Sequence, residues 1–303
     1  MIKVDLITGF LGAGKTTFLH YYVKYLKSQN LRVCILENDY GAINIDMMLL
    51  RDLEDENCAI EMVSGGGDIE CHQRRFKTKL IAIGMQKYDR VIIEPSGIFD
   101  IDEFFDTLYD EPLSNWYEIG NVFTIVDANI NITDNEMKYI LASELACAGK
   151  AIISKLDQNT NLDIIKAKLN EALNFIGVND KIDDKIFASN WDEITKEEYK
   201  MLMASGYRNA SYVKRQIKGY SSLFFMNKNF TLKGLEEITK EIFSNNIYGN
   251  VIRLKGFYLE NNSWYLFNAT KVDANISKIE DGQDVIIIIG SSLNVELINK
   301  LIN

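Results

Sequence analysis

The segment Gly9-Phe10-Leu11-Gly12-Ala13-Gly14-Lys15-Thr16-Thr17 lies near the first residue of the chain and fits the pattern G-x-x-x-x-G-K-[ST]. Residues 2–7 before it are mostly apolar and predict a strand, and the apolar residues from 18 to 26 recur at the spacing of a helix. A glycine-rich segment of this pattern between a strand and a helix forms a phosphate-binding loop, or P-loop. The segment therefore predicts an α/β fold of the P-loop class.

Each part of the P-loop (residues 9–17) has a chemical role. The glycines allow backbone N–H groups to curl around phosphates, and the helix that follows adds the positive end of its dipole. Lys15 is expected to place a positive charge on the β and γ phosphates, and the Thr16 hydroxyl is expected to ligate Mg²⁺. The residues expected to bind the nucleotide here are Gly12, Ala13, Gly14, Lys15, Thr16 and Thr17.

A second acid near the magnesium ion is a usual part of a P-loop enzyme. The run Val91-Ile92-Ile93 predicts a buried strand, and Glu94 follows at its end. Strands often end in polar residues, but beside a P-loop we interpret Glu94 as a magnesium ligand. Gly97, in the turn that follows, is expected to offer a backbone N–H to the γ-phosphate.

Another polar loop predicts selection of the base. The segment Ile152-Ile153-Ser154-Lys155-Leu156-Asp157 is similar to the [NT]-K-x-D element of guanine-nucleotide proteins. Asp157 can accept hydrogen bonds from guanine N1 and N2, which adenine cannot offer, and the Lys155 stem can lie along the base. Ser154 departs from the usual Asn or Thr and keeps a hydroxyl. An ordinary polar loop after a strand is the alternative interpretation.

The remaining pattern predicts two domains. Further apolar runs at 33–36, 59–63, 122–126 and 151–153 are separated by helical stretches, as in a buried, mostly parallel sheet with helices on both faces. We assign residues 1–205 to this P-loop domain and the polar, basic residues 206–220 to a linker. Residues 221–303 predict a smaller α+β domain of one sheet with two helices.

Composition narrows the class of partner and the compartment. The net charge is −10 and the longest basic run is Arg74-Arg75, so we expect no nucleic-acid partner. The longest clear apolar run, residues 285–289, has the length of a buried strand, so we expect no membrane association. The N-terminus does not resemble a secretion signal, and the four cysteines are scattered as unpaired thiols. These features predict a cytoplasmic protein.

Six motifs, in order along the chain, resemble those of the CobW-like family of P-loop GTPases. They lie at residues 9–17, 37–41, 93–97, 126–128, 253–257 and 285–290. The resemblance implies a GTPase that cycles between GTP and GDP with Mg²⁺ and acts as a metallochaperone, delivering a metal or metal cofactor to a client protein. It also implies that residues 37–41 form a switch, in which Asp39 positions or deprotonates the attacking water, and that relatives form nucleotide-dependent homodimers. Lys15, Asp39 and Glu94 are then the expected catalytic residues.

The chain departs from the family at its metal motif. Where the family has G-C-x-C-C, this chain has Gly67-Asp68-Ile69-Glu70-Cys71, so two carboxylates replace two thiolates. Such a set, with Glu37 from the switch, suits a borderline ion such as Zn²⁺ or Co²⁺. Two alternatives stay open, namely a loop that keeps only its switch role, and solvated acids beside an inert thiol.

Three functions are consistent with these features. The first is a GTPase metallochaperone or cofactor-insertion factor with an unidentified client metalloprotein. The second is a nucleotide-gated regulator of a partner protein that carries no transition metal. The third is a P-loop kinase of a small molecule, which would more often prefer ATP. The altered motif at Asp68, Glu70 and Cys71 raises the weight of the second.

Overall fold

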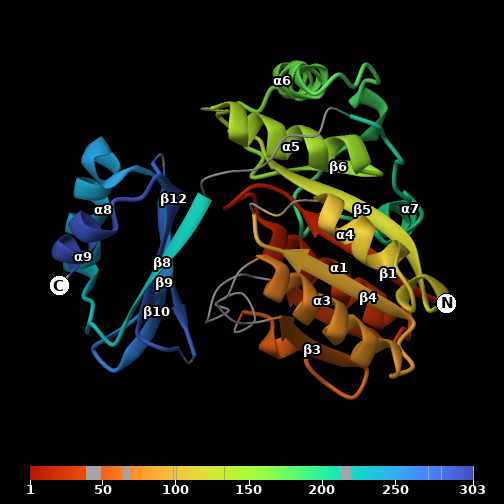
Figure 1. Cartoon of the computed structure of the whole chain (residues 1–303), viewed down its shortest axis with the longest axis horizontal. Coiled ribbons are helices and arrows are strands. Elements are labelled where there is room, and N and C mark those ends of the chain that lie inside the picture. The colour runs from red at the N-terminus through yellow and green to blue at the C-terminus, as the bar shows by residue number, and fades with distance from the viewer. Residues whose placement is uncertain are drawn as a thin grey trace. The chain divides into compact units, whose positions relative to one another are not determined.

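The computed structural model describes residues 1–38, 49–63, 69–97, 99, 101–132, 134–212, 220–271, 273–280 and 282–302, with backbone alone at 69, 70, 220 and 221. The chain divides into two compact units, Met1–Gln216 and Ile217–Asn303 (Figure 1). No helix in the described ranges is long and apolar enough to cross a membrane.

Unit 1 is built on a seven-stranded sheet in the order β3-β2-β4-β1-β5-β6-β7 (Figure 1). Every pairing of neighbouring strands is parallel. The strands are β1 (Ile2–Thr8), β2 (Val33–Asn38), β3 (Cys58–Val63), β4 (Arg90–Pro95), β5 (Tyr117–Asp127), β6 (Lys150–Ser154) and β7 (Ile186–Ala188). The central strands are buried on both faces, which explains why they read as continuous apolar runs.

Helices cover both faces of this sheet. Residues of α1 and α7 form one apolar cluster with one set of strand side chains, and residues of α3 and α4 form a second cluster on the other face, where Cys147 of α5 also packs. The helices of unit 1 are α1 (Lys15–Ser28), α3 (Ile69–Gly84), α4 (Ile101–Tyr109), α5 (Asn135–Cys147), α6 (Leu162–Phe175) and α7 (Lys196–Met203). The predicted α/β fold with helices on both faces is confirmed.

A buried polar network lies inside unit 1, toward the edge of the sheet at which the parallel strands begin. Asp5 of β1 accepts from the Arg90 guanidinium at 2.5 and 2.6 Å and from the Tyr22 hydroxyl at 2.8 Å. The backbone N–H and side-chain amide of Asn121 also donate to Asp5, at 2.8 and 2.9 Å. These bonds satisfy a carboxylate that is fully buried.

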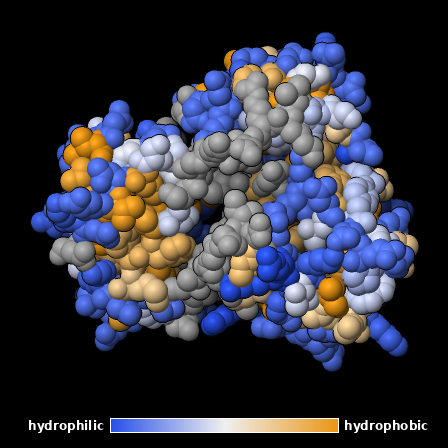
Figure 2. Space-filling view, viewed as in Figure 1, coloured by the Kyte–Doolittle hydropathy of each residue, from blue (hydrophilic) through white to orange (hydrophobic). Residues whose placement is uncertain are grey.

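Unit 2 is a five-stranded sheet in the order β11-β10-β9-β12-β8, and all neighbouring strands are antiparallel. Two helices pack against it around one apolar cluster. The elements are β8 (Tyr220–Met226), α8 (Leu232–Ser244), β9 (Asn250–Glu260), β10 (Ser263–Ala269), β11 (Ala274–Ile279), β12 (Val285–Ser291) and α9 (Val295–Ile302). In Figure 2 hydrophobic residues gather over part of this unit, and its exposed apolar side chains include Met226, Leu259 and Ile276. The predicted second α+β region is confirmed, but β11 was not predicted.

The segment expected as a linker begins with residues that pair with unit 1. The Val122 N–H donates to the Gly206 carbonyl at 3.0 Å, and the Gly206 N–H donates to Asn121 at 2.9 Å. The Tyr212 hydroxyl donates to Asp102 of α4 at 2.8 Å. Residues 206–212 are therefore fastened to the first unit, and residues 213–219 lie outside the described ranges.

Candidate functional site

The P-loop connects β1 to α1 at the carboxyl edge of the sheet, and its glycines have conformations that other residues rarely adopt. Gly9, Gly12 and Gly14 have φ angles of 138°, 80° and 98°. At Gly9 an added Cβ would lie 2.3 Å from the Ile125 carbonyl oxygen, so the loop passes directly against β5. Gly14 is the N-cap of α1 and leaves its first backbone N–H groups facing the loop.

Lys15 and Thr16 connect the P-loop to its surroundings. Lys15 is 7% exposed, and its ammonium donates to the Gly9 carbonyl at 3.1 Å, so its side chain folds back over the loop. The Thr16 hydroxyl donates to the Glu94 carboxylate at 2.8 Å. Glu94 is buried at the end of β4, in register with Glu37 on the neighbouring β2. The structure thus places a hydroxyl and a carboxylate side by side, an oxygen set that suits Mg²⁺.

Gly97 lies against the middle of the P-loop. A Cβ on Gly97 would meet the Leu11 backbone nitrogen at 2.5 Å. The turn after β4 and the P-loop are therefore neighbours at the same edge. Only a residue without a side chain permits this approach.

The predicted base-selection loop also reaches the P-loop. The Ser154 hydroxyl, at the end of β6, donates to the Ala13 carbonyl at 2.6 Å. Lys155 has a left-handed conformation (φ 54°), and its ammonium pairs with Asp127 at 2.6 Å. Asp157 is exposed, and its Oδ1 accepts from the Thr160 hydroxyl at 2.9 Å.

Trp191 belongs to this region, although its sequence context gave no signal of a site. It follows the short strand β7 in a polar loop, and its ring centroid lies 5.4 Å from that of Phe18 in α1. A Cβ on Gly14 would come within 3.9 Å of the indole. An aromatic ring therefore stands beside the N-terminus of α1.

Glu144 is a second residue that sequence patterns did not indicate. It lies in α5 with no exposed surface, and its Oε1 accepts from the Thr8 hydroxyl at 2.5 Å. Burial raises the pKa of this carboxyl to about 7, against opposing effects of the Thr8 hydrogen bond, the Lys15 charge and a hydrogen bond from the Gly9 backbone. A carboxyl that titrates near neutrality therefore supports the start of the P-loop.

The residues proposed for a transition metal are only partly described. Glu37 is buried at the end of β2, and Cys71 is partly buried in the first turn of α3. Asp39 and Asp68 lie outside the described residues, as does the side chain of Glu70. Within the ranges that are described, no three His, Cys, Asp or Glu side chains form a group that could hold a metal ion.

Next to Cys71, a polar contact connects two helices. His72 Nδ1 lies 3.8 Å from Glu103 Oε1 of α4, and both side chains are buried. The first turns of α3 and α4 are therefore in contact at this edge of the sheet.

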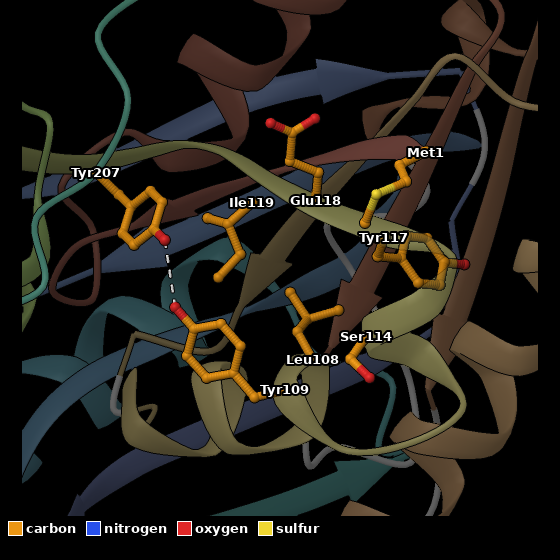
Figure 3. Close-up of a pocket in the computed structure, with 8 residues that line it drawn as sticks. All are labelled: Met1, Leu108, Tyr109, Ser114, Tyr117, Glu118, Ile119 and Tyr207. Atoms are coloured by element: carbon orange, nitrogen blue, oxygen red, sulfur yellow. Dashed lines mark hydrogen bonds between the residues drawn. The ribbon is translucent and has the colours of Figure 1, made fainter.

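A cavity lies at the opposite edge of the sheet from the P-loop (Figure 3). Met1 and the first residues of β5 line it, together with the end of α4. The hydroxyls of Tyr109 and Tyr207 meet across one side at 3.3 Å. None of the predicted nucleotide-binding residues lines this cavity.

Known proteins similar to the chain share the nucleotide-binding region. The family description "CobW/HypB/UreG, nucleotide-binding domain" matches residues 3–180. The zinc chaperone YjiA of Escherichia coli is 26% identical over 164 residues, which are 52% of this chain and 50% of the relative. Zinc-regulated GTPase metalloprotein activator 1 of Dictyostelium discoideum is 29% identical over 147 residues, 42% of this chain and 30% of the relative. The chain thus spans about half or less of the length of these relatives.

Among solved structures, the Zn(II)-bound YjiA GTPase from E. coli is similar at 18% sequence identity with a TM-score of 0.43, covering 99% of this chain and 97% of that one. The family match covers more than half of the chain and includes β1, the P-loop, β4 and the loop after β6. The chain therefore belongs to the CobW/HypB/UreG family and contains its nucleotide-binding domain.

Proposed function

We propose that the chain binds GTP with Mg²⁺ at the P-loop and hydrolyses it to GDP and phosphate. The observation that carries this proposal is the 2.8 Å contact between the Thr16 hydroxyl and the Glu94 carboxylate. These two groups would hold Mg²⁺, which when bound neutralises charge on the β and γ phosphates. In P-loop enzymes positioning and charge stabilisation supply most of the catalysis, and Thr16 and Glu94 would contribute to both.

The other P-loop residues would bind and orient the phosphates. The backbone N–H groups of Gly12, Ala13 and Gly14 would surround the phosphate oxygens, with Thr17 in the first turn of α1. Lys15 would exchange the Gly9 carbonyl for phosphate oxygens, since its ammonium already lies over the loop. The Gly97 N–H would reach the γ-phosphate from the neighbouring turn, and Asp39 would orient the attacking water.

The loop Ser154–Asp157 would bind the guanine base, with the Lys155 stem along the base and Asp157 at its edge. The Ser154 hydroxyl bonds to the Ala13 carbonyl, which fixes the base loop relative to the phosphate loop. Asp157 would accept from guanine N1 and N2, while Trp191 stands close to the same end of α1.

A binding assay tests the nucleotide and the base together. The chain has three tryptophans, and Trp191 is the one near Gly14, so GTP, GDP and ATP can be titrated with Mg²⁺ by intrinsic fluorescence. We expect GTP and GDP to bind more tightly than ATP, and Trp191→Phe to remove most of the signal. Asp157→Asn should lower the preference for GTP by about tenfold to a hundredfold, because hydrogen bonds to a charged group are lost. Tighter binding of ATP by the unmodified protein would contradict the assignment of the base.

Hydrolysis is measured separately, by release of phosphate. Thr16→Ala and Glu94→Gln should each lower the rate by about a hundredfold or more, as for other groups that stabilise transition-state charge. Lys200→Ala, an exposed change on α7, serves as the control for folding. Equal rates in all four proteins would show that the activity belongs to another site.

For the output of the cycle, we propose delivery of a transition metal to a client metalloprotein. Two kinds of relative carry names that refer to zinc, the zinc chaperone and the zinc-regulated metalloprotein activator. Cys71, at the start of α3, would provide a thiolate, and Glu37, Asp68 and Glu70 would provide oxygens for Zn²⁺ or Co²⁺. The metal here is cargo, and the client remains unidentified.

A nucleotide-gated regulator without a transition metal is the second candidate. It is favoured by the two carboxylates, Asp68 and Glu70, which stand where the family resemblance leads us to expect thiolates. Elemental analysis of the GTP-loaded protein after exposure to Zn²⁺ or Co²⁺ separates the two candidates. A chaperone should retain about one equivalent, lost in the double variant Glu70→Ala/Cys71→Ala and kept in Cys147→Ala. Absence of metal in both nucleotide states would favour the regulator.

A further inference from the structure

Glu144 has no role in the proposed hydrolysis, and yet it is buried directly beneath the P-loop. It lies on α5 among buried apolar residues, with 0% exposure. A carboxyl in such surroundings costs free energy when it is ionised unless charges and donors compensate it. Its neighbours therefore indicate what it does.

Those neighbours are the residues on either side of the turn into the P-loop. The Thr8 hydroxyl donates to Oε1 at 2.5 Å, and the Gly9 backbone N–H donates to the same carboxylate. In the next peptide unit, the Gly9 carbonyl accepts from the Lys15 ammonium at 3.1 Å. Gly9 thus stands between the Glu144 carboxylate and the Lys15 ammonium, and its backbone lies directly against Ile125 of β5.

We infer that Glu144 is a positioning residue of the nucleotide site, which holds Thr8, Gly9 and Lys15 in place and takes up a proton from solvent when a nucleotide binds. The inference rests on the proposed nucleotide site and extends it. The Lys15 charge lowers the pKa of Glu144 and so favours its ionised form, although burial outweighs this effect. Bound phosphates engage Lys15 and bring further negative charge to the loop, so the carboxylate binds H⁺ and becomes a neutral carboxylic acid.

The charge balance depends on few groups. The groups that act on Glu144 are the Thr8 hydroxyl of β1, the Gly9 N–H of the P-loop and the Lys15 ammonium of α1. From β5 and α6, which also pack against α5, no charged side chain in the described part of the chain contributes to its pKa. Oε2 is buried and makes no hydrogen bond to the described residues, so it is the atom at which the proton can reside.

Proton uptake has a sign that distinguishes it from titration of the nucleotide. If binding takes up a proton at a group whose pKa is about 7, affinity falls as the pH rises, by about thirtyfold between about pH 6 and pH 8.5. A terminal phosphate with a pKa near about 6 loses its proton over part of the same range, and its greater charge should strengthen binding. Proton uptake by Glu144 and deprotonation of the phosphate change the affinity in opposite directions. The contribution of Glu144 is therefore found by comparing the affinities of the unmodified protein and its variants at each pH.

The test is calorimetric titration of the full chain with GDP and Mg²⁺ in two buffers of different ionisation enthalpy. At about pH 8 we expect uptake of close to one proton by the unmodified protein and none attributable to the protein in Glu144→Gln. Glu144→Gln should also flatten the fall in affinity with pH, whereas Glu171→Gln, an exposed carboxylate on α6, should change neither quantity. A purely structural role would lower affinity equally at every pH.

The possible outcomes distinguish failure of the role inferred for Glu144 from failure of the proposed nucleotide binding. Binding of GDP without proton uptake, or with the same uptake in Glu144→Gln, overturns the role of Glu144 and leaves the nucleotide site intact. Failure of both GDP and GTP to bind at any pH refutes the proposed function, and the inference falls with it. If Glu144→Gln does not fold, uptake by the unmodified protein, with Thr8→Val as the second variant, still decides the question. Removing the hydrogen bond that stabilises the carboxylate should raise the pKa and reduce uptake near neutrality.

Discussion

Replacing Glu144 by Gln should change the pH dependence of folding stability even without a nucleotide. Burial raises the pKa of Glu144 from an ordinary 4.5 to about 7, so the unfolded chain releases this proton at lower pH than the folded chain. The stability that the protonated group contributes is fully present below the unfolded pKa of 4.5 and is lost as the pH rises through about 7. Gln keeps the shape of the neutral acid and does not ionise.

The size of the effect follows from the two pKa values. A tenfold difference in proton affinity corresponds to about 1.4 kcal/mol, so the interval from 4.5 to about 7 corresponds to about 3 kcal/mol. At about pH 8.5 ionisation of Glu144 destabilises the folded protein by nearly all of this free energy, and at about pH 5 by less than about 1 kcal/mol. Glu144→Gln should therefore be more stable than the unmodified protein at the higher pH by about 2 to 3 kcal/mol and nearly equal at the lower.

Urea unfolding of both proteins at the two pH values measures this difference, with unit 1 followed by the fluorescence of Trp116 and Trp191. A common slope against urea would show that the same surface is exposed on unfolding in both proteins. If Glu144→Gln were destabilised by the same amount at both pH values, the carboxyl would be acting only as a hydrogen-bond partner of Thr8, and the reasoning from its charge would be refuted.

Three further perturbations test other parts of unit 1. Gly9→Ala should abolish detectable GDP binding, whereas Gly206→Ala, also at positive φ (66°) but with no atom within 4 Å of the added methyl, should bind normally and lose only about 1 kcal/mol of stability. Arg90→Met should lower stability by about 3 to 5 kcal/mol, because it leaves the buried Asp5 carboxylate without its cation, and adding Asp5→Leu should recover part of the loss in thermal unfolding. Chelation of Mg²⁺ should weaken GTP binding in the unmodified protein and have little further effect in Thr16→Ala; an equal loss in both would argue against Thr16 as a ligand.

The sequence pattern predicted the elements whose burial is uniform. β2, β4 and β6 contain short runs that are apolar on both faces, β1 is mostly apolar, and the P-loop has a pattern that few other structures use. β7 was not predicted, because its three residues, Ile186–Ala188, are too few to show the alternation of apolar and polar residues that indicates a strand. β11 was not predicted because it is an edge strand whose residues are nearly all exposed, so its apolar and polar residues form no pattern set by burial.

The candidate site was predictable where chemistry fixes residue spacing, and hidden where tertiary contacts supply the partner. Thr16 and Glu94 are 78 positions apart, and the register of parallel strands brings them to one edge. Glu144 reads in the sequence as one more helical acid, because nothing local shows that 136 positions separate it from its partner Thr8. The proposed roles of Asp39 and Asp68 stay predictions, since both lie outside the described residues.

The attachment of residues 206–212 to unit 1 determines where an expression fragment of the nucleotide-binding unit should end. A fragment that stopped at residue 205 would remove the carbonyl that receives the Val122 N–H and would expose the Cys147 carbonyl, which now accepts from Arg208 at 2.9 Å. A fragment that runs through Tyr212 keeps both bonds and the Asp102 contact. The last residues of that longer fragment would stay bonded to β5, to the end of α5 and to α4, and the shorter fragment should be degraded more readily by proteases during preparation.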